Sequence, residues 1–252
     1  AKYSDGTGTY LEVFSDVEPV SPEGEALVEQ IREMDASVPF LVGGASADLV
    51  DSKSAIFGLV PLALGIIALA TFILLFLMTG SVLVPLKAIV LNVLSLGATF
   101  GAMVWIFQDG HLSGLLGFTA TGTLDTTTPI LMFCIAFGLS MDYEVFLLSR
   151  IKEAHDLTGD TNLAVVTGLQ RTGRIMTAAA AVLAVTFIAF STSGVTFIKL
   201  MGVGLTLAIL LDATIVRALL VPAFMRLAGE ANWWAPAPLR RLHQRIGINE
   251  SG

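Results

Sequence analysis

Residues 56–78 read IFGLVPLALGIIALATFILLFLM, a run without a charged side chain. A helix needs about 20 predominantly apolar residues to cross roughly 30 Å of hydrocarbon. This stretch is long enough, and it holds no group that is costly to bury in lipid. It predicts a transmembrane helix and places the chain among the helical membrane proteins.

Four further apolar segments have a similar length and composition. They cover residues 86–107, 129–148, 175–193 and 197–224. Of the 252 residues, 54% are hydrophobic and 14% are charged, against about 25% charged in a typical soluble domain. We therefore expect a five-helix transmembrane bundle over residues 45–228. Within it, the spacing of Gly97 and Gly101 predicts a close helix contact.

The beginning of the chain differs from the rest. Residues 1–55 carry a net charge of −8, whereas the remainder carries +1. Residues 10–14 and 39–42 resemble short strands, and a helix start of the Ser-Pro-Glu type at Ser21 lies between them. Residues 1–44 are therefore predicted to be part of an α+β lobe. Because Ala1 is not followed by a signal-peptide pattern, we expect a fragment or a split half of a longer protein.

Basic residues predict the orientation in the membrane, because Lys and Arg gather in cytoplasmic loops. Two regions of the chain are rich in them. These are the link between the third and fourth predicted spans (Arg150, Lys152, Arg171, Arg174) and the tail (Arg226, Arg240, Arg241, Arg245). We expect a multi-pass plasma-membrane protein with a cytoplasmic, interfacial tail over residues 229–252. The acidic lobe then lies outside the cytoplasm.

An acidic residue interrupts the third predicted span. Asp142 lies eight residues before Arg150, or about 12 Å along a helix. A carboxylate at this depth costs roughly 2.5–3.5 kcal/mol on insertion scales, and such residues face a bundle interior and relay protons. Burial favours the neutral carboxyl group, and the hydroxyl of Tyr143 can donate and accept hydrogen bonds. A proton relay is the favoured interpretation, and a structural polar pair is the alternative.

The fifth predicted span contains a second acidic and basic combination, Asp212 and Arg217. Arg217 lies nine residues before Arg226, as Asp142 lies eight residues before Arg150, so the two residues should have a similar depth in the membrane. We expect Arg217 to balance a carboxylate, either that of Asp142 or one on a helix outside this chain. The alternative is that Arg217 extends to the inner interface.

These motifs resemble those of one transporter family. Residues 133–150, FCIAFGLSMDYEVFLLSR, are similar to the tenth transmembrane helix of the mycobacterial membrane protein large (MMPL) family, part of the resistance-nodulation-division (RND) superfamily. Residues 171–174, RTGR, with the Ala-rich segment after them, resemble its eleventh helix. Residues 211–222, LDATIVRALLVP, resemble its twelfth. The segment from Val42 to Asp51 is similar to the end of its second extracytoplasmic porter domain.

The resemblance implies a five-helix half of an RND-type bundle with a partial extracytoplasmic porter lobe. It implies the C-terminal half of an exporter of lipids or other amphipathic molecules, driven by the proton gradient. In the family, two Asp-Tyr pairs and a further Asp and Arg form a proton relay. Asp142 and Tyr143 match one such pair, and Asp212 and Arg217 match the other two residues. We expect Ser140 and Glu144 to support them.

The implied partners are the missing N-terminal half, membrane lipids and a lipid or hydrophobic substrate, and further candidates are a homo-oligomer and accessory membrane proteins. Two other functions stay open: a non-exporting RND-like protein that assists protein export or senses lipids, and a structural membrane subunit. A P-loop pattern is absent, Cys134 is the only cysteine, and the three histidines lack ligand spacing. We therefore expect no enzymatic activity, no cofactor, no metal site and no nucleic-acid partner.

Overall fold

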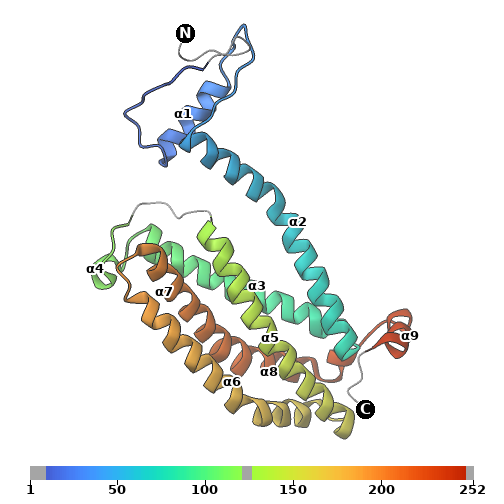
Figure 1. Cartoon of the computed structure of the whole chain (residues 1–252). Coiled ribbons are helices and arrows are strands. Elements are labelled where there is room, and N and C mark those ends of the chain that lie inside the picture. The colour runs from blue at the N-terminus through green and yellow to red at the C-terminus, as the bar shows by residue number, and fades with distance from the viewer. Residues whose placement is uncertain (1–9, 121–126, 248–252) are drawn as a thin grey trace. The chain divides into compact units, whose positions relative to one another are not determined.

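The computed structural model describes residues 10–120 and 127–247, which are mostly helical (Figure 1). Helical segments η1 and η2 have π-helical geometry, and η3 is a 3₁₀-helix. In chain order the elements are α1 (Pro22–Arg32), α2 (Ala45–Thr79), α3 (Leu83–Met103), η1 (Val104–Gln108), α4 (Ser113–Leu116), α5 (Thr127–Thr158), α6 (Thr161–Ser191), α7 (Thr196–Leu211), η2 (Asp212–Leu220), α8 (Val221–Ala228), η3 (Gly229–Trp233) and α9 (Ala237–Ile246).

The chain divides into two units, residues 1–65 and residues 66–252. In the first unit, α1 starts where the sequence predicts, because the Ser21 hydroxyl accepts a hydrogen bond from the Gly24 amide at 3.1 Å. Arg32 at the end of α1 donates to both carboxylate oxygens of Asp51 on α2, at 2.6 and 2.8 Å. Lys53 forms a further ion pair with Glu25. These contacts hold α1 against the first turns of α2.

The described residues do not support the predicted α+β lobe. The described residues of the first unit contain helix and irregular segments, without a strand at 10–14 or 39–42. The side chains of these segments are exposed, fully so at Leu41, apart from the half-buried Val42. A strand needs a neighbouring strand to pair its backbone N–H and C=O groups. The local alternation of apolar and polar residues supplies no such partner, so it could not decide the structure.

The prediction of five membrane helices is confirmed. Among the described residues, five helices are long and apolar enough to cross a membrane: α2, α3 with η1, α5, α6, and the continuous segment from Thr196 to Trp233. Several extend beyond the apolar residues that predicted them. α6, for example, begins at Thr161 because the Asp160 carboxylate accepts hydrogen bonds from the amides of Asn162 and Leu163, at 2.8 and 3.2 Å.

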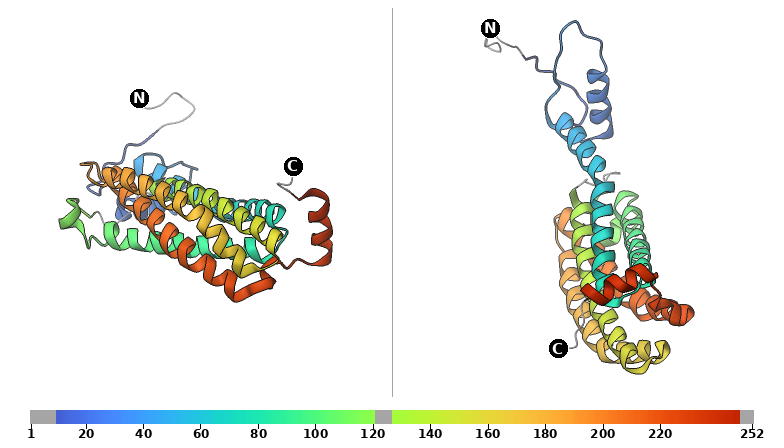
Figure 2. Two further views of the ribbon diagram at one scale, coloured as in Figure 1. Left: turned by 90° about the horizontal axis from the view of Figure 1, so that it is seen from below. Right: turned by 90° about the vertical axis from the view of Figure 1, so that its right-hand side faces the viewer.

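In the second unit, α5, α6 and α7 pack side by side, and α3 packs against α5 and α7 (Figures 1 and 2). Glycines permit the closest contacts. A Cβ atom at Gly202 on α7 would lie 2.5 Å from the Ser191 amide nitrogen and 2.7 Å from the Phe187 carbonyl oxygen. The backbones of α6 and α7 therefore touch at a position where only glycine fits.

Gly97 and Gly101 do not form the close helix contact that their spacing predicts among the described residues. A Cβ atom at Gly97 or Gly101 would meet no atom within 4 Å in the described part of the chain. The spacing of these residues therefore does not mark a contact among the described helices. Helix contacts are made instead at single glycines such as Gly202, which no motif singles out.

Candidate functional site

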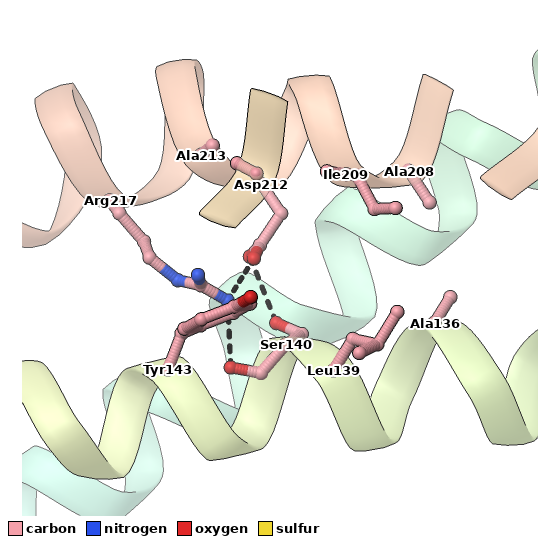
Figure 3. Close-up of a pocket in the computed structure, with 10 residues that line it drawn as sticks. Ala136, Leu139, Ser140, Tyr143, Ala208, Ile209, Asp212, Ala213 and Arg217 are labelled. Carbon is pink, nitrogen blue, oxygen red and sulfur yellow. Dashed lines mark hydrogen bonds and ion pairs between the residues drawn. The ribbon is translucent and has the colours of Figure 1, made fainter. Parts of the chain in front are cut away.

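A buried charged pair lies on η2, facing α5. The Asp212 carboxylate and the Arg217 guanidinium form an ion pair, and the two residues are 8% and 4% exposed. Arg217 Nη2 also donates a hydrogen bond of 2.7 Å to the backbone carbonyl oxygen of Ser140 on α5 (Figure 3). The cation thus joins the carboxylate of its own segment to the backbone of a second helix.

Further polar groups surround this pair. The Ser140 hydroxyl donates to Asp212 Oδ1 at 2.9 Å, and Asn92 Nδ2 on α3 donates to the Ser140 oxygen at 3.2 Å. The Arg217 guanidinium lies over the Tyr143 ring, with Cζ 4.8 Å from the ring centroid. Such a cation–π contact is strongest where water is excluded. Side chains from α3, α5 and η2 therefore form one buried network.

The π-helical geometry of η2 brings Asp212 and Arg217 together. In an α-helix, residues five apart point about 140° away from one another, because each residue turns the helix by about 100°. In a π-helix, hydrogen bonds join residues five apart and bring them closer to the same face of the helix. The π segment therefore lets two residues with this spacing form a direct ion pair.

A small cavity adjoins the network. Its volume is about 10 Å³, close to the least space that holds one water molecule. Its walls combine the four polar residues of the cluster with small and apolar side chains. The lining residues are Ala136, Leu139, Ser140, Tyr143, Ala180, Ala208, Ile209, Asp212, Ala213 and Arg217 (Figure 3). The alanines of α5, α6 and α7 leave this space open.

The arrangement couples charge to helix packing. Protonation of Asp212 would replace the ion pair by a neutral acid beside a buried cation. A buried cation without a counter-charge is strongly unfavourable, and breaking such a pair typically costs about 3–5 kcal/mol. Gain or loss of one proton would therefore change how strongly the charged groups of η2 interact with one another and with Ser140 on α5.

Asp142 does not lie in the interior of these helices, in contrast to our expectation. It is exposed, and within the described residues it makes no hydrogen bond or ion pair. It follows Ser140 by two residues, which turns it by about 200° around α5, whereas Tyr143 returns to the face of Ser140. Among the described residues, Arg217 pairs with Asp212 and not with Asp142.

The structure adds Asn92 to the site, a residue that the motifs did not single out. Asn92 is a polar residue in an otherwise apolar span, a signal that sequence reasoning could have used. Glu144 is 2% exposed but does not line the cavity, and its Oε1 atom has no hydrogen-bond partner among the described residues. No group of three His, Cys, Asp or Glu side chains in residues 10–120 and 127–247 could hold a metal ion.

Comparison with known proteins bears on this arrangement of membrane helices. The model of the MMPL family matches residues 3–247, nearly the whole chain. The chain belongs to the MMPL family. It is a multi-pass membrane protein, as the five apolar helices indicate.

Three relatives illustrate the relationship of this MMPL chain to longer proteins. A membrane protein of Streptomyces coelicolor is 49% identical over 91% of the chain and 32% of its own length. The trehalose monomycolate exporter MmpL3 of Mycobacterium tuberculosis is 46% identical over 84% of the chain and 22% of its own length. The mycolic acid-containing lipids exporter MmpL11 of Mycolicibacterium smegmatis is 37% identical over 94% of the chain and 26% of its own length. The chain thus spans between about a fifth and a third of these curated relatives.

Proposed function

We propose that the chain is the C-terminal part of an MMPL transporter that exports lipids or other amphipathic molecules across the plasma membrane. Two relatives carry the names of lipid exporters, which supports the class of substrate. The proton gradient supplies the energy. The basic segments face the cytoplasm, because the residues 150–174 and the tail carry most of the arginines.

The buried Asp212–Arg217 pair carries this proposal. Ionisable residues within a membrane span are costly and mark proton or substrate pathways. Asp212 has a cation, a hydroxyl donor and a small cavity beside it, so its charge can change while hydrogen-bond partners stay at hand. Each change of charge alters the attraction between η2 and α5, which converts proton movement into helix movement.

Asp142 takes part in the proton relay from the opposite face of α5. The relatives are three to five times longer than the matched segment, so further helices are available to cover the face that carries Asp142. A carboxylate in lipid is unfavourable, whereas one between two helices can find a partner. We infer that Asp142 meets a polar group of the remaining transporter. Tyr143 follows Asp142 on α5 and its ring contacts the Arg217 guanidinium, so it connects Asp142 to the buried pair.

The test uses the complete transporter in proteoliposomes with an imposed pH gradient and a fluorescent lipid analogue as cargo. Asp142→Asn and Asp212→Asn should each reduce gradient-driven transport on the order of 10²-fold, the usual contribution of a proton-transfer group. Glu153→Gln is the matched control, because Glu153 lies on α5 in a partly exposed ion pair with Arg150. It should transport normally.

Full transport by a folded Asp142→Asn or Asp212→Asn variant would exclude the relay. If the parent protein binds lipid but moves none under any gradient, a lipid-sensing or protein-export role replaces export. If it neither binds lipid nor exchanges protons, the chain belongs to a structural subunit.

A further inference from the structure

Four buried polar side-chain atoms have no hydrogen-bond partner among the described residues. They are Lys87 Nζ, Asn92 Oδ1, Glu144 Oε1 and Arg217 Nε. Asn92 and Arg217 belong to the network around Asp212, and the other two extend it. Unpaired buried polar atoms are rare in folded proteins, and each costs about 1–3 kcal/mol. Their concentration in one part of the bundle indicates a ligand that satisfies them.

The four side chains are arranged along the axis of the helix bundle. Asn92 contacts Ser140, which sets the relative position of α3 and α5. Glu144 lies four residues after Ser140, and Lys87 lies five residues before Asn92. Because α3 and α5 run in opposite directions, both steps lead about 6–8 Å toward the end where α5 turns into α6 (Figure 1). Lys87 and Glu144 therefore lie one turn further along the same path.

Glu144 is almost fully buried, at 2% exposure, and forms no direct hydrogen bond or ion pair with a described residue. The charged groups near Glu144 are Lys87 from α3 and Arg217 and Asp212 from η2. Neither Lys87 nor Arg217 forms an ion pair with Glu144, so their side-chain nitrogen atoms lie more than 4.0 Å from its carboxylate oxygens. An ionised buried carboxylate needs close partners. Water can bridge such groups, because it both donates and accepts hydrogen bonds.

We propose that Glu144 and Lys87 form a second proton-binding site, joined to Asp212 by ordered water and lying between it and the cytoplasmic end of the bundle. This inference rests on the proposed function, because it extends the same proton path. Glu144 holds the proton, and Lys87 stabilises the carboxylate that remains after the proton has left.

The transfer is balanced at each step. The Asp212 acid gives its proton to a bridging water molecule, and that water gives one of its own protons to the Glu144 carboxylate. Asp212 becomes the carboxylate that pairs with Arg217, and Glu144 becomes the neutral acid. Release from Glu144 to cytoplasmic water then restores the charge beside Lys87. The net result is one proton moved toward the cytoplasm.

A spectroscopic experiment tests the site without transport. Infrared difference spectra of the complete transporter, recorded between acidic and alkaline buffers, should contain a carboxylic-acid C=O band that shifts in heavy water. Glu144→Gln should lose this band, whereas Glu153→Gln on the same helix should retain it. A spectrum of Glu144→Gln identical to that of the parent would show that Glu144 keeps one protonation state and would overturn the proposal.

A paired substitution separates proton binding from a structural role. Replacing both members of a buried charge pair with apolar residues is often neutral or stabilising, whereas removing one is destabilising. Lys87→Met/Glu144→Leu should therefore fold as well as the parent or better. We expect its gradient-driven transport to fall on the order of 10²-fold, as for loss of a proton-transfer group. Full transport by this double variant would assign the pair a purely structural role.

The two proposals fail in different ways. If the parent protein shows no gradient-driven transport, the proposed function fails, while the infrared band still decides whether Glu144 binds a proton. If the parent transports and the double variant does so equally well, only the second site is excluded.

Discussion

The Arg217 guanidinium forms an ion pair with the Asp212 carboxylate five residues before it, and both side chains are buried. The same guanidinium donates to the Ser140 carbonyl oxygen on α5 and covers the Tyr143 ring. One cation therefore connects a π-helical segment to a neighbouring membrane helix. Substitutions at this pair should change both stability and transport, which requires measurements that separate the two.

A double-mutant cycle measures the interaction of the pair. Asp212→Asn and Arg217→Gln should each lower the free energy of unfolding by about 3–5 kcal/mol, because each leaves its former partner uncompensated. The double variant should lose less than the sum, with a coupling of about 0.5–3 kcal/mol. Thermal unfolding of the complete protein in detergent provides the measurement. Arg226→Gln, an exposed control on α8, should stay within about 0.5 kcal/mol of the parent.

Asn92 should contribute to stability through its hydrogen bond to Ser140. Asn92→Ala removes the hydrogen bond to the Ser140 hydroxyl, worth about 0.5–1.5 kcal/mol. Combined with Ser140→Ala, its effect on unfolding should be less than additive. Thr99 is the matched control, because it is buried on the same helix and, among the described residues, its hydroxyl bonds only to the Ser95 carbonyl oxygen. Thr99→Ala and Ser140→Ala should add within about 0.3–0.5 kcal/mol. Additivity of the Asn92 and Ser140 effects would contradict the contact.

Gly202→Ala should separate α6 from α7. The added Cβ atom meets backbone atoms of Phe187 and Ser191, which cannot rotate away as a side chain can. We expect a loss of about 1–3 kcal/mol in unfolding free energy, the usual cost of overpacking. Gly173→Ala on α6 is the control, because its Cβ would meet no described atom within 4 Å. Equal stability of the two variants would show that the helices are not in backbone contact.

Lys199 should hold α4 in place. Its ammonium group is buried and donates to the carbonyl oxygens of Leu116 and Gly117 at the end of α4. Lys199→Met keeps the length of the side chain but removes these bonds. The amides of Gly117 and Phe118, which bond to the Ser113 carbonyl, should then exchange faster with heavy water. Exchange in α6 should not change. Unaltered exchange at 117–118 would show that α4 is held by other contacts.

Local properties of the sequence predicted much of the helical structure. The five membrane helices follow from runs of apolar residues, and the start of α1 follows from Ser21 and the proline after it. The segments at 10–14 and 39–42 show where such reasoning stops. A strand is defined by its neighbour, and alternation within one segment says nothing about whether a neighbour exists.

Some residues of the buried network could be named from the sequence, but their arrangement could not. An ionisable residue in an apolar span is visible from the sequence, so Asp142, Asp212 and Arg217 could be named. Their pairing could not, because the regular helix of a sequence-based prediction places residues five apart on different faces. Asn92 and the buried position of Glu144 depend on which faces of α3 and α5 meet, which no single helix reveals.

By itself, the sequence determined that the described part of this chain contains five helical segments long and apolar enough to cross a membrane, and that charged residues interrupt two of them, because burial in lipid depends on local composition. Only the tertiary structure decided that Arg217 pairs with Asp212 and that Asp142 faces outward. Which side chains meet depends on how each helix is rotated about its axis. The π segment of η2 and the close contact at Gly202 affect that rotation, and neither can be read from the regular helix that the sequence predicts.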